Sequence, residues 1–179
     1  NFSFSTKDSH SSLCDAVTIV RGAFREKDGF FLRAESAYNA LSYIDSLAKY
    51  DKRIYNSYGG QSLHSRSHGE GFMDIVTNRF GGHGLYILDE PESALSVTRQ
   101  FELMTKMKEL VDKDSQFIVC THSPILMAYP GASILELSSD GIRQVPYEQT
   151  TNYQITKYFL NNYRSMLREM GFDDIELFR

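Results

Sequence analysis

The stretch from residue 84 to residue 96, read as G-L-Y-I-L-D-E-P-E-S-A-L-S, constrains the fold of this chain more than any other. It begins with a glycine and four apolar residues and then reaches two adjacent carboxylates, Asp89 and Glu90. A short apolar run after glycines predicts a strand that is buried on both faces. Pro91 ends this strand because proline lacks the N–H that a ladder requires. The two acids are therefore expected at the carboxyl end of a central parallel strand, where open α/β sheets bind ligands.

The adjacent carboxylates need a positive charge nearby, because two acids side by side repel each other and lose solvation when buried. A Mg²⁺ ion that is held by a carboxylate and by substrate phosphates is the natural candidate. The structural alternative is that Asp89 and Glu90 only form the first turn of a helix, where the helix dipole favours acids.

A second motif lies upstream, where Ser67-His68-Gly69-Glu70 opens a segment with helical apolar periodicity. Ser67 followed by Glu70 predicts a capping box at the start of a helix over about 69–80. A helix N-terminus also binds anions through its free N–H groups, so the same geometry can form a phosphate site. The expected core residues of this helix are Phe72, Ile75, Val76 and Phe80.

A third motif lies downstream, where residues 117–124 read F-I-V-C-T-H-S-P. The apolar run predicts another buried strand, with His122 directly after it. Cys120 in that strand is most simply a small apolar core residue. A lone histidine after a strand is more often structural than functional.

The remaining elements follow from periodicity and turn signals. We expect a strand at 29–33, a helix over 34–50, a hairpin over 132–145 and a helical tail over 151–170. A further helix follows the two acids and ends near residue 114. Its buried face is expected to consist of Val97, Phe101, Met104, Met107 and Val111.

In this order, the motifs resemble those of ABC-type ATPases, the branch that includes SMC- and RecF-like chromosome proteins and OLD-like ATPases. The Walker B strand and D-loop of that family resemble I-L-D-E-P with S-A-L in this chain. A variant of the signature motif resembles S-H-G-E, and the strand with the switch histidine resembles F-I-V-C-T-H-S-P. The chain is most similar to a small group of bacterial predicted AAA/ABC-type ATPases. The resemblance covers about residues 28–145. It implies an α/β P-loop NTPase fold, a three-layer sandwich around a mostly parallel sheet.

The resemblance also implies a role for each motif in a homodimer that sandwiches ATP and Mg²⁺. Asp89 would hold Mg²⁺ through water, Glu90 would act as the general base for attack on the γ-phosphate, and His122 would sense that phosphate. ATP on the partner subunit would be contacted by the signature residues Ser67, His68, Gly69 and Glu70. The D-loop at the dimer interface would consist of Ser93, Ala94, Leu95 and Ser96.

Three positions depart from the family pattern. Ser96 stands where many ABC ATPases have an aspartate, and Glu35 or Ser36 stands where a Q-loop glutamine is expected. The phosphate cradle G-x-x-x-x-G-K-[ST] does not occur, and no glycine in the chain is followed by lysine. That loop supplies the N–H groups, the lysine and the Mg²⁺-binding hydroxyl, so we expect this chain alone not to hydrolyse ATP efficiently.

The missing cradle and the first residue, Asn1 rather than methionine, favour a C-terminal portion of a longer ATPase. The P-loop would then be supplied by missing N-terminal sequence or by another chain. Within the 179 residues we expect one incomplete domain, with a lead-in at 1–28, the motif core at 29–146 and a helical tail at 147–179.

Composition excludes several other classes of protein. A net charge of −4 gives no support for a strongly basic nucleic-acid surface, so DNA binding rests on analogy with the SMC- and RecF-like proteins alone. No apolar run has membrane-spanning length and no signal peptide is present, so a soluble cytoplasmic protein is expected. His64 and His68 have metal-ligand spacing, but no cysteine cluster or third ligand accompanies them.

Two functional hypotheses from different classes remain. The first is an ATPase in which ATP closes the dimer and hydrolysis opens it. The second is a non-catalytic interaction module that kept the fold without nucleotide turnover. Retention of Asp89, Glu90, His122 and the signature argues for the first.

Overall fold

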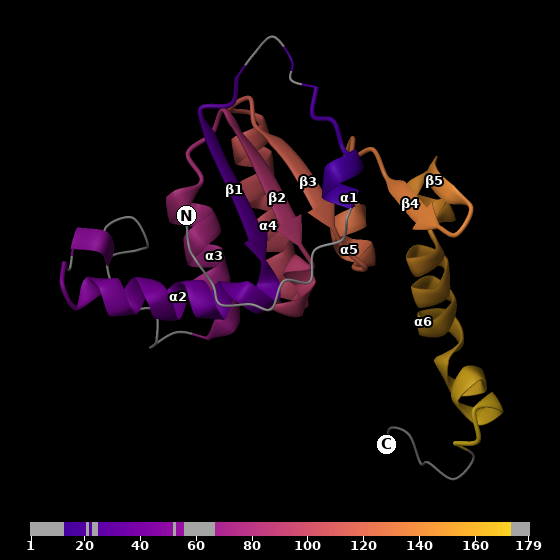
Figure 1. Ribbon diagram of the computed structural model, residues 1–179. Coiled ribbons are helices and arrows are strands. Elements are labelled where there is room, and N and C mark those ends of the chain that lie inside the picture. The colour runs from indigo at the N-terminus through magenta and orange to yellow at the C-terminus, as the bar shows by residue number, and fades with distance from the viewer. Residues whose placement is uncertain (1–12, 21, 23–24, 52, 56–66, 173–179) are drawn as a thin grey trace. The chain divides into compact units, whose positions relative to one another are not determined.

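The computed structural model describes residues 13–20, 22, 25–51, 53–55 and 67–172 of the 179-residue chain. It forms two compact units, residues 1–120 and residues 121–179, and each is described by itself (Figure 1). The signature residues Ser67 to Glu70 lie in the first unit, whereas His64 lies outside the described residues. His122 belongs to the second unit.

The first unit is built on a three-stranded parallel sheet in the order β1-β2-β3. Its strands are β1 (Asp28–Arg33), β2 (Gly84–Asp89) and β3 (Gln116–Cys120). The strand that ends in Asp89 is therefore the central one, paired in parallel with both neighbours. This confirms the prediction of a central parallel strand whose carboxyl end carries the two acids.

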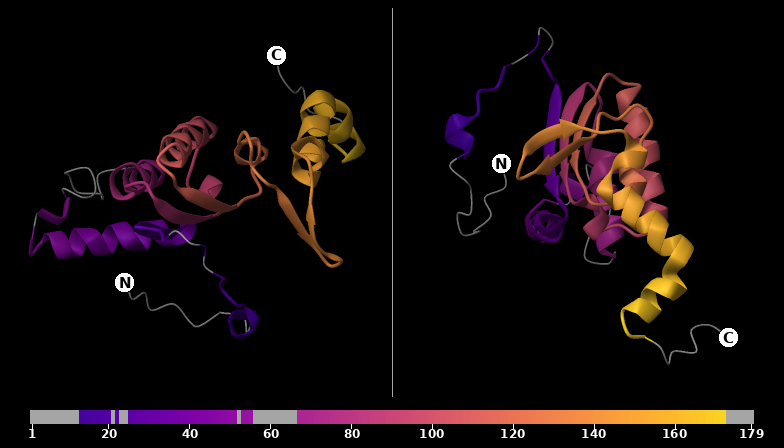
Figure 2. Two further views of the ribbon diagram at one scale, coloured as in Figure 1. Left: turned by 90° about the horizontal axis from the view of Figure 1, so that it is seen from above. Right: turned by 90° about the vertical axis from the view of Figure 1, so that its right-hand side faces the viewer.

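One face of the sheet is covered by α3 (His68–Arg79) and α4 (Val97–Val111), as Figure 2 shows. Phe30, Tyr86 and Phe117 form one row across this face, and the Tyr86 ring stacks on Phe80 with 4.2 Å between centroids. Tyr86 is fully buried. The predicted core of α3 is confirmed, since its apolar residues are all buried: Phe72, Ile75, Val76 and Phe80.

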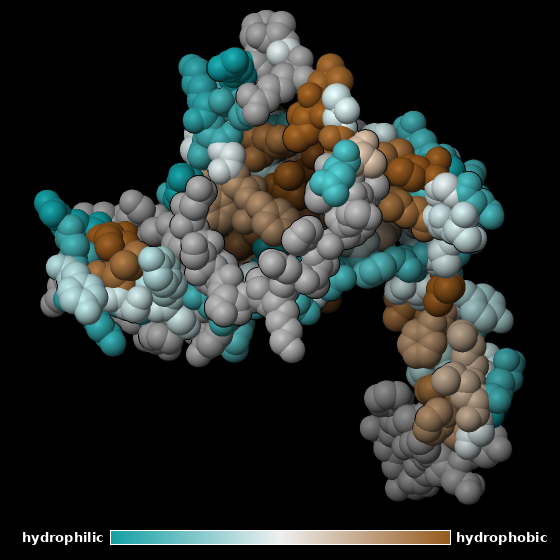
Figure 3. All heavy atoms as spheres, viewed as in Figure 1, coloured by the Kyte–Doolittle hydropathy of each residue, from teal (hydrophilic) through white to brown (hydrophobic). Residues whose placement is uncertain are grey.

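The opposite face of the sheet differs from the expected three-layer sandwich. Phe31 and Ile118 point to this face and are 62% and 46% exposed. Figure 3 views it directly and shows apolar residues gathered over the strands. Within this unit, the described residues therefore form two layers. We expected the strands to be buried on both faces of the sheet, because the residues that point to each face are apolar. A layer that covers the second face is not found among the described elements of this unit.

Helix α2 (Ala34–Ala48) follows β1 directly and packs on α3. Leu41 and Ile44 on its inner face are buried. Gly71 of α3 lies at this contact, and a Cβ there would force the Leu41 side chain to shift. This packing holds the start of α3 beside the carboxyl end of β1.

Helix α4 corrects one prediction. Its buried residues are Gln100, Leu103, Met107 and Leu110. Of the expected face, Met107 is buried as predicted and Met104 is half-buried, whereas Val97, Phe101 and Val111 are exposed. Both sets have helical spacing, so periodicity alone did not distinguish them. The approach of the helix to β3 and α3 selected the set that is buried.

The second unit contains α5 (Pro124–Met127), the antiparallel hairpin β4 (Leu135–Ser138) and β5 (Gly141–Gln144), and α6 (Thr151–Glu169). The hairpin and the long helix were both predicted. The Glu136 carboxylate accepts hydrogen bonds from Arg143 across the hairpin and from the Thr151 backbone N–H, each at 2.9 Å. The hairpin is thereby attached to the first turn of α6.

Candidate functional site

The carboxyl edge of the sheet places three side chains in one row. Arg33 ends β1, Asp89 ends β2 and Cys120 ends β3, and the strand register aligns them directly. All three project from the face that α3 and α4 do not cover, since residues alternate between faces along a strand. The predicted metal ligand Asp89 therefore has a basic neighbour on one side and a thiol on the other.

Arg33 provides the positive charge that the acids were expected to need. Its Nε donates to Asp89 Oδ2 at 2.7 Å, and the two side chains are 52% and 22% exposed. The hydrogen bond and the charge of Asp89 raise the pKa of Arg33, and the charges of Glu35 and Glu90 add to this. Sequence reasoning assigned the whole compensation to Mg²⁺ and missed Arg33. The detectable signal was a basic residue ending the preceding strand of a parallel sheet.

Glu90 occupies a strained backbone conformation. Its φ and ψ are 49° and 50°, the left-handed region, which costs a residue with a Cβ roughly 1–2 kcal/mol. Its N–H donates to the Cys120 carbonyl at 2.9 Å, and its side chain is exposed. Strain of this kind is often found at functional sites because other contacts maintain it there. The turn moves the Glu90 carboxylate out of the strand direction and into solvent.

Cys120 corrects a second prediction, because it is exposed rather than buried in a core. It lies on the uncovered face, which the apolar run around it could not reveal. Partial desolvation of the thiol raises the pKa of Cys120, and the charges of Asp89 and Glu90 raise it further. The thiol is therefore predominantly protonated at neutral pH and a poor nucleophile.

The predicted D-loop connects the acids to α4. Pro91 is buried in the 3₁₀ turn η3 (Pro91–Ser93), and Leu95 is also buried. The Ser96 hydroxyl caps α4 by accepting the Arg99 N–H at 3.4 Å. Ser96 thus has a local structural role at the position where the family often has an aspartate.

The predicted capping box is confirmed at the start of α3. The Glu70 carboxylate accepts the Ser67 N–H at 2.8 Å and the Ser67 hydroxyl at 2.9 Å, while the Ser67 Oγ accepts the Glu70 N–H at 3.4 Å. Arg99 lies 3.2 Å from the same carboxylate. A phosphate that bound here would have to replace the Glu70 carboxylate at Ser67.

Gly69 lies where the signature residues pack closely against the D-loop. The residue is buried, and a Cβ there would lie 2.9 Å from the Ala94 carbonyl oxygen and 3.1 Å from Arg99 Cδ. No side chain fits between these backbones. The need for glycine in S-H-G-E therefore has a packing cause in this structure, beside the close phosphate approach that the resemblance implied.

A groove of about 510 Å³ is lined by residues of the predicted signature and D-loop and by Glu35, one of the two candidates for the Q-loop position. Glu35 comes from the expected Q-loop position after β1, His68 from the signature, and Ser93 with Ala94 from the D-loop. Ala34 and Ala37 complete its lining. Segments that are far apart in the sequence thus meet beside the carboxyl end of the central strand, where the α/β architecture favours ligand binding.

The donor set at this edge fits Mg²⁺ in the manner that this ion prefers, with one or two carboxylates and otherwise water and substrate phosphates. Asp89 would be the protein ligand, with Glu90 next to it in the chain. Across the described ranges, no cluster of three or more His, Cys, Asp or Glu side chains is arranged to hold a metal ion, so a cage made by the protein alone is not found there.

His122 lies in the loop between β3 and α5. Its carbonyl accepts a hydrogen bond from the Asn152 side chain at 3.1 Å, and its side chain is exposed. The neighbouring Ser123 caps α5 by accepting the N–H groups of Ile125 and Leu126. The loop is thus held to α6 and α5 within the second unit.

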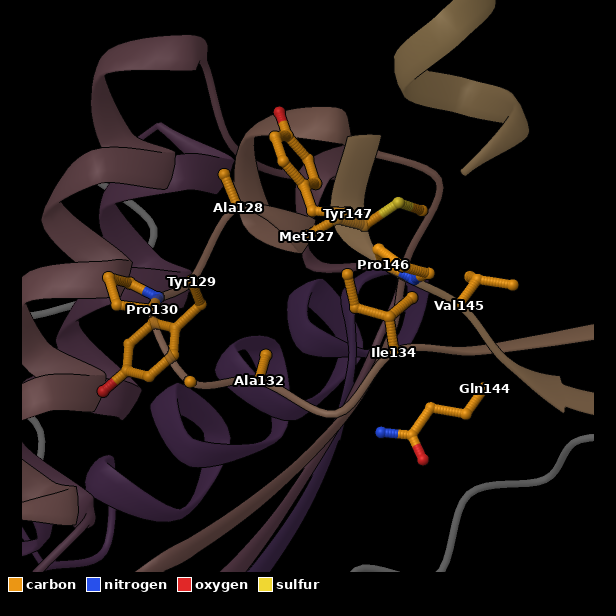
Figure 4. A pocket seen from close by; sticks show the side chains of 11 residues that line it. Met127, Ala128, Tyr129, Pro130, Ala132, Ile134, Gln144, Val145, Pro146 and Tyr147 are labelled. Atoms are coloured by element: carbon orange, nitrogen blue, oxygen red, sulfur yellow. The ribbon is translucent and has the colours of Figure 1, made fainter. Parts of the chain in front are cut away.

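The second unit also contains a larger cavity of about 590 Å³, shown in Figure 4. The residues that line it include Met127, Ile134, Val145 and Tyr147. The Tyr147 hydroxyl donates to the Pro124 carbonyl at 2.8 Å. No charged side chain lines this cavity, so it lacks the groups that acid–base or phosphate chemistry needs.

Comparison with models of known protein families gives no match, and no curated protein matches the chain. In the described part of the chain, no helix has both the length and the apolar character needed to cross a membrane.

Proposed function

We propose that this chain supplies the signature, Walker B and switch-histidine parts of an ABC-type ATPase that binds and hydrolyses ATP as a dimer. The P-loop would come from polypeptide outside these residues. The observation that supports the proposal most is the groove in which Glu35, His68 and Ala94 meet beside the carboxyl end of the central strand. The segments after β1 and β2 lie at one edge in any parallel sheet, so the specific support is that the start of α3, with the S-H-G-E motif, meets them there.

The chain's own groups suit this chemistry in distinct ways. Asp89 would hold Mg²⁺, which when bound offsets charge on the nucleotide phosphates. The exposed, solvent-directed Glu90 would orient and deprotonate the attacking water. Ser67 and the first turn of α3 would contact phosphate on the partner's nucleotide once Glu70 releases them. His122 remains the proposed switch residue.

The first experiment joins this chain to a segment that restores a P-loop and measures ATP binding and turnover. Glu90→Gln should leave ATP binding intact and abolish turnover, because the amide cannot accept the proton from water. Glu92→Gln, two residues further on, is the matched control and should retain turnover. Normal turnover in Glu90→Gln would remove Glu90 from the role of base.

A second experiment tests the signature by following ATP-driven dimerisation of the same protein. Ser67→Arg places bulk and charge at the proposed phosphate contact and should prevent the dimer, whereas Ser139→Arg in the exposed β4–β5 turn should not. An ATP-dependent dimer that persists in Ser67→Arg would exclude this signature assignment.

One observation favours the alternative of a non-catalytic interaction module. Both proposed ligand-binding groups are satisfied by the chain itself, Asp89 by Arg33 and Ser67 by Glu70. A fold that no longer binds nucleotide could keep such pairs in place of a ligand. Absence of ATP binding in the P-loop-restored protein would support this second function over the first.

A further inference from the structure

The contact between Arg33 and Asp89 occupies the carboxylate that a metal ion would need. Arg33 Nε lies 2.7 Å from Asp89 Oδ2, and no other hydrogen bond or ion pair to the Asp89 side chain occurs among the described residues. A guanidinium and a hydrated Mg²⁺ cannot both occupy the space in front of the same carboxylate oxygen. An ion at Oδ2 would therefore require Arg33 to move, and an ion at the neighbouring Oδ1 would lie close enough to the guanidinium for the two positive charges to repel.

The position of Arg33 makes this pair exchangeable. The side chain is 52% exposed and reaches Asp89 through a flexible stem, so it can leave without disturbing the core. Ion pairs with this much solvent contribute little to stability. Other acids stand close by, since the charges of Glu35 and Glu90 also act on Arg33.

The backbone at Arg33 adds an electrostatic reason for the pair. Arg33 is the N-cap residue of the 15-residue helix α2, and no side chain caps this helix. A cation at the positive end of a helix dipole is unfavourable without a nearby acid. Asp89 is one of the acids that offset this charge, beside Glu35 in the first turn of α2, so a metal ion at Asp89 would remove part of the compensation.

We propose that Arg33 gates the metal position at Asp89: its guanidinium holds Oδ2 of the carboxylate in the nucleotide-free chain, and a divalent cation must either displace it there or bind at Oδ1 against its charge. Free metal alone binds weakly as a result, because the guanidinium, the helix N-terminus and the metal repel one another. An anion such as a nucleotide phosphate offsets all three. Arg33 is thus a positioning residue for Asp89, and the inference rests on the proposed function.

The test measures Mn²⁺ binding to the full chain without nucleotide, from the electron paramagnetic resonance signal of the free ion. Mn²⁺ is the probe because it accepts the same oxygen ligands as Mg²⁺. Arg33→Gln should bind Mn²⁺ about tenfold more tightly than the wild type, since it removes a full positive charge beside the ion. Arg33→Lys keeps the charge and should remain close to the wild type.

Two controls separate a gate from a general charge effect. The double variant Arg33→Gln with Asp89→Asn should return to weak binding. Arg53→Gln removes an arginine from another exposed pair, with Asp51 at 2.8 Å, and should leave Mn²⁺ affinity unchanged. Arg33→Met, which keeps the aliphatic stem, replaces Arg33→Gln if the latter does not fold.

Equal Mn²⁺ affinity in the wild type and in a folded Arg33→Gln or Arg33→Met variant would overturn the proposal, as would tighter binding that persists without Asp89. The outcome is separable from that of the proposed function. If Arg33→Gln binds Mn²⁺ more tightly through Asp89 but the P-loop-restored protein never binds ATP, the role of Arg33 as a gate is supported and the ATPase proposal is rejected. If the P-loop-restored protein hydrolyses ATP but substitution of Arg33 does not change the Mn²⁺ affinity, the ATPase proposal is supported and the gate is rejected.

Discussion

The two ends of the three-stranded sheet each pair an aspartate with an arginine, and they hold the aspartate in different ways. At the amino end, Asp28 Oδ2 accepts the Tyr86 hydroxyl at 2.9 Å and the Gly81 N–H at 3.1 Å, with Arg79 3.5 Å from Oδ1. The Tyr86 hydroxyl in turn accepts the Gly82 N–H at 3.0 Å. These donors belong to backbone and to a buried ring, so they cannot move away.

At the carboxyl end, Asp89 is held by the single flexible side chain of Arg33, and Glu90 follows in a strained turn. The contacts at the amino end stabilise the fold, whereas in the proposed function Asp89 at the carboxyl end exchanges Arg33 for a ligand. This agrees with the general placement of ligands at the carboxyl ends of parallel strands. Each prediction below tests whether the two ends differ in this way.

The largest expected effect is on stability at the amino end. Asp28→Ala should lower the free energy of unfolding by about 2 kcal/mol, because it leaves the Tyr86 hydroxyl and the Gly81 N–H without their acceptor. Asp89→Ala is the matched substitution at the other end and should change it by no more than the experimental error. Urea unfolding measures the free energy of unfolding of each variant against the wild type. A loss in Asp89→Ala as large as in Asp28→Ala would make both ends structural.

The same carboxylate should make stability depend on pH. Burial by itself would raise the pKa of Asp28, but the hydrogen bonds from Gly81 and Tyr86 outweigh it and lower the pKa. A lowered folded-state pKa stabilises the protein above the unfolded value of about 3.9, and this contribution is lost as the pH falls through the folded value. The stability difference between wild type and Asp28→Ala should therefore shrink below about pH 4. A difference independent of pH from 6 to 2 would contradict this assignment.

The next effect is a gain in stability at the carboxyl end. Glu90→Gly should raise the free energy of unfolding by about 1 kcal/mol, because glycine adopts the left-handed region without strain. His83 has a similar φ of 50° in the loop before β2, so His83→Gly should give a comparable gain. In the P-loop-restored protein, only Glu90→Gly should lose turnover. No gain from Glu90→Gly would show that the strain is absent or offset by contacts of the side chain.

The smallest expected effect is on the rate at which iodoacetamide alkylates Cys120. The other cysteine of the chain, Cys14, is replaced by serine so that only Cys120 reacts. The charges of Asp89 and Glu90 contribute to the raised pKa of Cys120, so removing one of them should lower it. Asp89→Asn also frees the positive charge of Arg33, which acts in the same direction. Alkylation at pH 8 should become a few-fold faster, because more thiolate is present. The variant Asp112→Asn, on the far side of α4, should leave the rate unchanged.

Several elements were predictable because their causes lie within a few residues. The capping box joins Ser67 to Glu70 over three positions, and both the β4–β5 hairpin and α6 follow from turn residues and periodicity. The placement of Asp89 and Glu90 at the end of a central strand was also predictable. It required only an apolar run, a following proline and the rule that such runs form the middle of parallel sheets.

Other features depended on contacts between distant segments. The buried face of α4 shares Met107 with the predicted one but contains Leu103 and Leu110 instead of Val97 and Phe101. Both sets have helical periodicity, and contacts with the neighbouring elements decide which one is buried. Cys120 is exposed because one face of β3 lacks a cover among the described elements of its unit. An apolar run in a sequence does not state which of its faces is covered.

The sequence by itself determined the local chemistry of this protein: a capped helix at S-H-G-E, two acids after an apolar strand, and the order of the motifs. Only the tertiary structure decided that Arg33, 56 residues before Asp89, is the partner of that carboxylate, and that Glu35, His68 and Ala94 line one groove. The physical reason is range. Capping and strand termination act over one helical turn or one peptide bond, whereas the pairing of charges across a sheet depends on strand register, which forms only when the strands assemble.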